Sequence, residues 1–464
     1  MPPTLPSSVV PTFPSTGEPL VSYAERVRRG LAPLVALLSS CLALLCLVSL
    51  ADIVTQLDGL AVVNERLVGW AGVGGMTSIA VAILALLAAP RFGAGLPLAA
   101  GAAAAVFGLA LGRSVIDDAQ LALTLVMLGL GAGGLLGGVA CMPAELPRRW
   151  RGATLTAYGL PLVAGPPVLS WVALHVSAGE DPRLALHPPV WPLAVASALV
   201  VCWSALTLLL EPARERSSPG LAWDSAWTSL VVAASVPPVV VMLLGFEPDI
   251  PLLWLRPLIV VGSALALVGL ALTCLAVPTV AARIGLVAAG VVALCWPVCI
   301  GLLLVTADAG ASRVSAWGVT SIALAAGCGA ALGCWRPGTG VVAGLMLVAA
   351  AAAGAWVMSA TPWPMVAAAG PMAAGAGAAL VGGLRCASGD LTGLRLVGAA
   401  TASTLVLGSL IAVPLSWALG GGVPDTEEAA RAAGRVFLGL TFALAVLAAA
   451  YSSTLFRRLT DATG

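Results

Sequence analysis

Residues 128–171 read LGLGAGGLLGGVACMPAELPRRWRGATLTAYGLPLVAGPPVLSW, two apolar stretches joined by a short loop with Arg148, Arg149 and Arg151. The stretches extend over roughly residues 120–142 and 153–175. A bilayer core of about 30 Å takes about 20 helical residues to cross, and both stretches are that long. The segment therefore predicts two membrane-spanning helices with a tight, positively charged turn between them.

The same pattern repeats along the whole chain. Hydrophobic residues make up 60% of the 464 residues and charged residues only 9%, against about a quarter charged in a soluble domain. The apolar stretches predict spans near residues 31–51, 68–89, 93–112, 120–142, 153–175, 190–210, 226–246, 257–277, 284–306, 316–334, 340–358, 364–384, 395–419 and 434–454. The predicted fold is an all-α, polytopic bundle of fourteen transmembrane helices with no soluble domain between them.

Charge alternates between the loops on the two sides of this bundle. All 22 basic residues are arginines. Most fall in the loops on the side of the chain ends: Arg26, Arg28, Arg29, Arg91, Arg148, Arg149, Arg151, Arg214, Arg216, Arg283, Arg336, Arg385, Arg395, Arg457 and Arg458. Because positively charged loops stay in the cytoplasm, both termini are predicted to be cytoplasmic. The lysine-free composition, rich in Ala, Gly, Val and Leu, is typical of a GC-rich bacterial genome and predicts a bacterial cell membrane.

Small residues indicate close helix packing and an internal repeat. Gly129–Gly138 has glycines at small-xxx-small spacing, which lets helix backbones approach closely. The fourth span ends in Leu-Leu-Gly-Gly138 and the twelfth in Leu-Val-Gly-Gly383. This pairing predicts two related six-helix bundles, over 31–215 and 281–464, with two linking helices over 216–280 and a disordered cytoplasmic tail over 1–30. Trp203 and Trp296 lie nearer mid-span than the other tryptophans, and packed core is the preferred interpretation.

Several classes of chemistry find no support in the sequence. The ten cysteines mostly stand singly in apolar stretches and there are only two histidines, so no metal site is predicted. No nucleotide-binding loop is present, and neither a cofactor, a catalytic residue nor a nucleic-acid partner is expected. The pair Asp117-Asp118 beside Arg113 leaves one minor alternative open, a polyprenyl-dependent membrane glycosyltransferase.

The quoted segment resembles the fourth and fifth helices of the major facilitator superfamily. The resemblance rests on the loop Pro147-x-x-x-Arg151-Gly152 and on Gly165-Pro166 in the fifth span. Fourteen spans, and Asp224 before the seventh, are similar to the 14-helix drug:proton antiporter branch of that family. The resemblance implies two six-helix halves plus two extra helices, transport by alternating access, and a gating role for Gly165 and Pro166.

The sequence also departs from that family. The loop between the second and third spans is only Pro90-Arg91-Phe92-Gly93, without the acidic residue of the family's signature. The basic residue that the family carries in its fourth helix aligns with Leu125. No Asp or Glu stands near the middle of a span, so Asp52, at the outer end of the first, is the nearest candidate for proton coupling, with Arg113 as a candidate gate. Asp52 also fits a solvated helix end.

Two functions of different class follow. The first is a secondary transporter that exports a hydrophobic or amphipathic small molecule or lipid, with membrane lipids and protons as further partners. The second is a transport-inactive membrane scaffold or accessory subunit, bound to another membrane protein. Neither is an enzyme.

Overall fold

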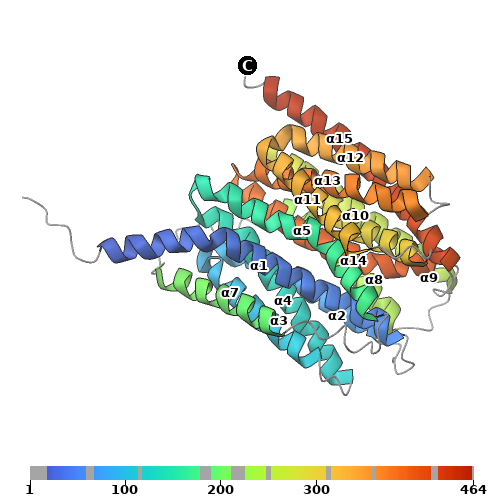
Figure 1. The fold of residues 1–464 in the computed structure, drawn as a ribbon, viewed down its shortest axis with the longest axis horizontal. Helices are drawn as coiled ribbons and strands as arrows, with labels where there is room; N and C mark the ends of the chain where they lie inside the picture. The colour runs from blue at the N-terminus through green and yellow to red at the C-terminus, as the bar shows by residue number, and fades with distance from the viewer. Residues whose placement is uncertain are drawn as a thin grey trace, which may run out of the picture.

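The computed structural model describes residues 18–58, 67–112, 118–177, 190–210, 225–246, 252–309, 315–357, 362–419 and 427–461. Every regular element in these residues is an α-helix, and the helices lie side by side in one bundle (Figure 1). In chain order the helices are α1 (Glu18–Asp58), α2 (Leu67–Phe92), α3 (Gly95–Gly112), α4 (Asp118–Glu145), α5 (Arg148–Ser177), α7 (Val190–Leu210), α8 (Ser225–Phe246), α9 (Leu252–Ala276), α10 (Val280–Ala309), α11 (Ala316–Trp335), α12 (Pro337–Val357), α13 (Pro362–Ala387), α14 (Leu391–Leu419) and α15 (Glu427–Asp461).

This architecture confirms the predicted all-α polytopic bundle, because each helix covers one of the predicted spans. In the described part of the chain, 12 helices are long and apolar enough to cross a membrane. Helix α7 contributes a shorter apolar segment, Leu193–Leu209. Helix α5 is less apolar because its first turn carries three arginines and its interior three prolines.

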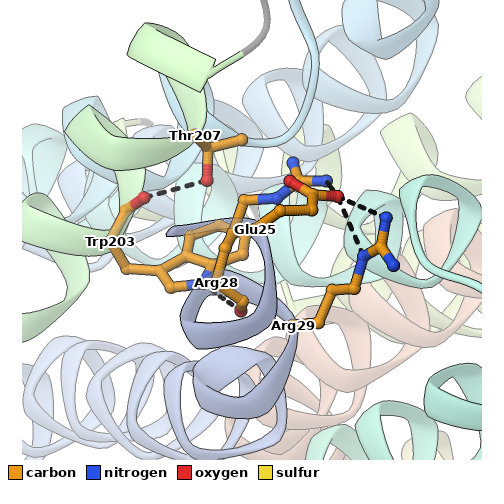
Figure 2. A network of polar contacts seen from close by, with 5 residues as sticks. All are labelled: Glu25, Arg28, Arg29, Trp203 and Thr207. Atoms are coloured by element: carbon orange, nitrogen blue, oxygen red, sulfur yellow. Dashed lines mark hydrogen bonds and ion pairs between the residues drawn. The ribbon is translucent and has the colours of Figure 1, made fainter. Parts of the chain in front are cut away.

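Helix α1 begins at Glu18, inside the stretch 1–30 that is predicted to be a disordered tail. Its first turns are held by polar contacts that the apolar pattern does not reveal (Figure 2). Glu25 Oε1 accepts hydrogen bonds from Arg28 at 3.0 Å and from Arg29 at 2.9 Å, and such pairs three and four residues apart stabilise a helix. The indole N–H of Trp203 in α7 donates to the Arg28 carbonyl at 3.0 Å.

The glycines of α4 bring two neighbouring helices into backbone contact. A Cβ added to Gly129 or Gly133 would run into the carbonyl oxygens of Gly74 and Ser78 in α2. On another face of α4, a Cβ added to Gly134 would lie 2.8 Å from the Cα of Gly101 in α3. The run that predicts close packing therefore has two packing faces, one for α2 and one for α3.

Helix α13 has the same arrangement in the second part of the chain. A Cβ added to Gly377 would meet the Ala326 carbonyl of α11, and one added to Gly375 would lie 2.6 Å from the Gly344 carbonyl oxygen of α12. Helix α13 thus lies between α11 and α12 as α4 lies between α2 and α3. Helices α4 and α13 correspond to the fourth and twelfth predicted spans, which the sequence relates by their similar ends at Gly138 and Gly383.

Contacts divide the helices into two groups. We call α1 to α5 and α7 the N-terminal group and α10 to α15 the C-terminal group; α8 packs between α2 and α14, and α9 packs mainly on α8. Helix α1 begins and α15 ends at the same end of the bundle, at the left and at the top of Figure 1 respectively. We call this the arginine-rich end, because the turns there carry Arg91, Arg148, Arg149, Arg336 and Arg385. That the two groups are separate domains stays a prediction.

Candidate functional site

The loop Pro147–Gly152 is a compact turn that starts α5. The backbone N–H groups of Trp150 and Arg151 donate to the Pro147 carbonyl, at 2.9 and 3.3 Å. The side chain of Arg151 turns back, and its Nε donates to the Leu146 carbonyl at 2.9 Å. Arg151 therefore satisfies a carbonyl just beyond the end of α4, which fixes the direction in which α5 leaves.

Gly152 lies against the C-terminal group. A Cβ at this position would come within 2.9 Å of three guanidinium atoms of Arg385, at the end of α13. Arg385 Nη1 donates to Cys334 Sγ of α11 at 2.7 Å. One turn along α5, the Thr156 hydroxyl lies 2.9 Å from the Gly152 carbonyl and 3.6 Å from the same sulfur. The loop motif thus forms part of a polar contact between α5, α11 and α13.

Two further contacts join the groups near this end. A Cβ on Gly159 of α5 would lie 3.1 Å from atoms of Val381 and Leu384 in α13. A Cβ on Gly398 of α14 would lie 2.6 Å from the Ala140 Cβ of α4. Gly398 is needed for α14 and α4 to approach this closely, whereas at Gly159 the neighbouring side chains would have to shift slightly. All these contacts lie in the half of the bundle nearer its arginine-rich end.

A fourth contact between the groups lies beside the Gly165-Pro166 motif, nearer the middle of the bundle. Pro167 has no N–H, so the carbonyl of Val163, four residues earlier, loses its helical partner. The indole N–H of Trp296 in α10 donates to this carbonyl at 2.8 Å. Trp296 is only 3% exposed, which confirms it as packed core. The prolines of α5 thus create an acceptor that a residue of the other group uses.

Trp296→Phe should weaken this contact while keeping most of its apolar packing. Hydrogen bonds between membrane helices are worth about 0.6 to 2 kcal/mol, so we expect a loss of about 1 kcal/mol, measured as a lower melting temperature in detergent. Trp317→Phe is the matched control, because Trp317 is 83% exposed. A melting temperature equally low in both variants would contradict the role of the Val163 carbonyl.

Tyr158 is the largest fully buried side chain among the described residues. It is 0% exposed on α5, one residue before Gly159, and its hydroxyl has no hydrogen-bond partner among the described residues. An unpaired buried polar group costs about 1–3 kcal/mol.

Tyr158→Phe should remove that penalty. We expect the melting temperature to rise, for a gain of about 1 kcal/mol in stability. Tyr451→Phe serves as the control, because Tyr451 is only half-buried. A fall in the melting temperature of Tyr158→Phe would show that the hydroxyl has a partner and would refute this prediction.

The remaining predicted site residues are only partly placed. Gly165 faces α1, since its added Cβ would lie 2.8 Å from Leu44 Cδ1, and Pro166 is buried in α5. Asp52 belongs to α1, but its side chain lies outside the described residues, as do Arg113 and Asp224 altogether. Their roles stay predictions.

Sequence reasoning missed Glu145, Cys334, Arg385 and Gly398. Glu145 is the last residue of α4, and its Oε1 accepts a hydrogen bond from the Ala94 N–H at 2.6 Å, which holds the start of α3. The short turn 90–93 lacks the acidic residue of the family signature, and the hydrogen bond from Ala94 to Glu145 holds this turn against α4 instead. The arginines predicted which loops lie at this end of the bundle. Which side chains meet there depends on how the helices pack.

Among the described residues, no group of three or more His, Cys, Asp or Glu side chains could hold a metal ion. The buried polar residues are mostly uncharged serines and threonines, many of which donate back to their own helix; Ser40, for example, donates to the Ala36 carbonyl at 2.8 Å. The polar contacts of the site are thus made by hydroxyl groups and by the guanidinium groups of Arg151 and Arg385.

Comparison with solved structures gives the class of fold. The peptide transporter POT in complex with sulfate superposes with a TM-score of 0.57 at 15% identity, covering 92% of this chain and 95% of that one. A mutant of the peptide transporter POT in complex with alafosfalin gives 0.55 at 14%, covering 92% and 94%. An auto-inhibited POT family peptide transporter gives 0.53 at 13%, covering 91% and 96%. No family model and no curated protein matches the sequence.

The chain therefore shares the major-facilitator-type fold of these peptide transporters. The likeness covers nearly the whole chain and extends over both helix groups and the linking helices.

Proposed function

We propose that this chain is a secondary transporter that works by alternating access, with the substrate route between the two helix groups. The observation that carries the proposal is the contact of α5 and α14 with the opposite group. Glycines make this contact, and it lies in the arginine-rich half of the bundle. Alternating access is largely a rocking of one bundle against the other around a site near the membrane midplane. A contact built from small residues can open and close as a unit.

The positive-inside rule places the arginine-rich end in the cytoplasm. The described arrangement is then closed on the cytoplasmic side, and the prolines of α5, held by Trp296, lie just beyond the closure. On this proposal Gly152, Gly159 and Gly398 form the cytoplasmic gate. Gly165 and Pro166 lie in α5, the helix that holds Gly152 and Gly159, and we propose a gating role for them, as the resemblance to the 14-helix antiporter branch implies.

For the substrate we propose an apolar or amphipathic small molecule, moved outward. Among the side chains that the structure describes, Asp and Glu stand at helix ends and turns rather than at mid-span. Among the fully buried polar side chains that the structure describes, Arg28 alone is charged, and the others are serines and threonines. Such walls suit a solute that needs little charge compensation. Coupling to protons through Asp52 remains part of the proposal.

Peptide uptake is the second candidate, because the solved structures with this fold include peptide transporters. A peptide carries two charged ends, which buried sites bind by pairing with opposite charges. Peptide transport would therefore require charged groups from the outer parts of the helices to reach the route.

Flux into and out of proteoliposomes tests both candidates. The probes are a lipophilic cationic dye and a fluorescent dipeptide, each measured with and without an imposed pH gradient. Gradient-driven dye movement that Asp52→Asn abolishes would support the first proposal, and dipeptide uptake would replace it with the second. No flux of either probe, with folded protein confirmed, would refute transport of these classes and favour the scaffold.

A further inference from the structure

A lateral groove lies between α9, α10 and α15, away from the contact of the two helix groups. Its volume is about 320 Å³, at the lower end of the roughly 300–1,000 Å³ found for ligand sites. Each helix contributes one face at helical spacing. The lining residues are Leu267, Leu270, Ala271, Cys274 and Leu275 of α9, Leu286, Val287, Gly290, Val291 and Leu294 of α10, and Leu444, Leu447, Ala448 and Tyr451 of α15.

The groove exists because α9 uses its other face for packing. Gly262 and Gly269 lie against α8, where an added Cβ would come within 2.8 Å of Val240 and 2.6 Å of Ala233. The face of α9 with Leu270 and Cys274 does not pack on α8 and lines the groove. The rim is open to the side, since Leu275 is 60% and Leu447 65% exposed. In a chain that spans a membrane, such a rim faces lipid hydrocarbon.

One end of the groove carries positive charge. Arg283 stands on α10 three and four residues before Leu286 and Val287, so it shares their face. Its Nε donates to the Val277 carbonyl at 2.6 Å, which holds the side chain beside the end of α9. A guanidinium has five N–H donors, and the described residues give its terminal nitrogens no hydrogen bond. Arg458, seven residues after Tyr451, is exposed on the same face of α15.

We propose that this groove binds one acyl chain of an anionic phospholipid, with the phosphate near Arg283 and Arg458. The apolar walls match a hydrocarbon chain, and the charge at one end matches a headgroup. The arginines lie at the level where headgroups meet the bilayer core, as basic pockets for anionic lipids do. The bound lipid would fill the space between the linking helix α9 and the C-terminal group, and so hold α9 in place. This inference does not depend on transport.

Gly290 provides the test, because a Cβ added there would have nothing within 4 Å. Gly290→Leu should fill the groove without disturbing the backbone. Gly327→Leu is the matched control: Gly327 is also a helical glycine with nothing within 4 Å of its added Cβ, but it is on α11 and outside the groove. The melting temperatures of both variants show whether they fold like the parent protein.

The probe is phosphatidylglycerol with a photoactivatable group on its acyl chain, incorporated in nanodiscs with the full-length protein. Peptide mass spectrometry should locate the cross-links on the groove faces of α9, α10 and α15. We expect Gly290→Leu to lower this labelling several-fold and Gly327→Leu to leave it unchanged. If Gly290→Leu folds poorly, Leu447→Trp at the exposed rim serves as a second filling variant.

Labelling spread evenly over the lipid-facing helices, or unchanged in both filling variants, would overturn the proposal. A phosphatidylcholine probe with the same chain tests the headgroup. It should label the groove more weakly than phosphatidylglycerol in the parent protein and in Arg283→Lys. The difference between the two lipids should shrink in Arg283→Gln and disappear when Arg458 is also replaced by Gln. Equal labelling by both lipids in the parent protein would overturn the assignment of an anionic headgroup.

Discussion

Gly133→Val will give the largest loss of stability among the substitutions considered. A Cβ at this position would collide with the Ser78 carbonyl oxygen and lie 3.0 Å from the Cα of Ser78, both backbone atoms of α2. Backbone cannot rotate away as a side chain can, so α2 and α4 must separate. We expect a cost at the upper end of the about 1–3 kcal/mol typical of overpacking, or above it. Thermal unfolding followed by size-exclusion chromatography measures the loss.

The control separates packing from helix propensity. Gly354→Val makes the same chemical change within α12, where an added Cβ would meet nothing within 4 Å. Valine is a better helix former than glycine, so the control should melt at or slightly above the parent temperature. Equal melting temperatures for the two variants would show that α2 and α4 are not in backbone contact at Gly133.

Gly398→Val will open the arginine-rich end. In the closed arrangement its Cβ would lie 2.6 Å from the Ala140 Cβ, which is fixed to the backbone of α4. This clash raises the free energy of the closed arrangement, in which α14 and α4 touch, and does not affect an arrangement in which they are apart. A penalty of about 1–3 kcal/mol shifts a two-state equilibrium by roughly 5- to 150-fold. If the two groups rock, the variant should therefore rest with this end open and should lose transport.

The rate at which Cys334 is chemically labelled measures this opening, and the measurement does not need a known substrate. The Cys334 sulfur lies between Arg385 and Thr156, and separation of the groups would expose it. A membrane-impermeant maleimide, read by peptide mass spectrometry, should modify Cys334 several-fold faster in Gly398→Val than in the parent protein. Gly327→Val, whose Cβ meets nothing, should leave the rate unchanged. Unchanged labelling in Gly398→Val, with folding retained, would mean that this contact is not a moving gate.

The parts of the site that the sequence anticipated are those set by local chemistry. The Pro147–Gly152 loop is placed at a helix start by its proline and arginines, and Gly165-Pro166 lies within α5 as expected. Pro167 shows from sequence alone that the Val163 carbonyl lacks a helical donor, but nothing in the sequence selects Trp296, 133 residues away, as the new donor. For a related reason the sequence does not reveal that Trp203 of α7 donates to the Arg28 carbonyl in the first part of α1.

For the described residues, the sequence by itself determined the order of the helices and the apolar segment that each contains. A bilayer leaves a hydrophobic segment almost no choice but a helix of about 20 residues, because every backbone group must find its partner within the segment. Only the tertiary structure decided which faces meet. In lipid the apolar faces of a helix are nearly equivalent, so packing depends on shape. Three features are therefore properties of the assembled bundle: the contact of Gly398 with Ala140, the contact of Gly152 with Arg385, and the groove beside Gly290.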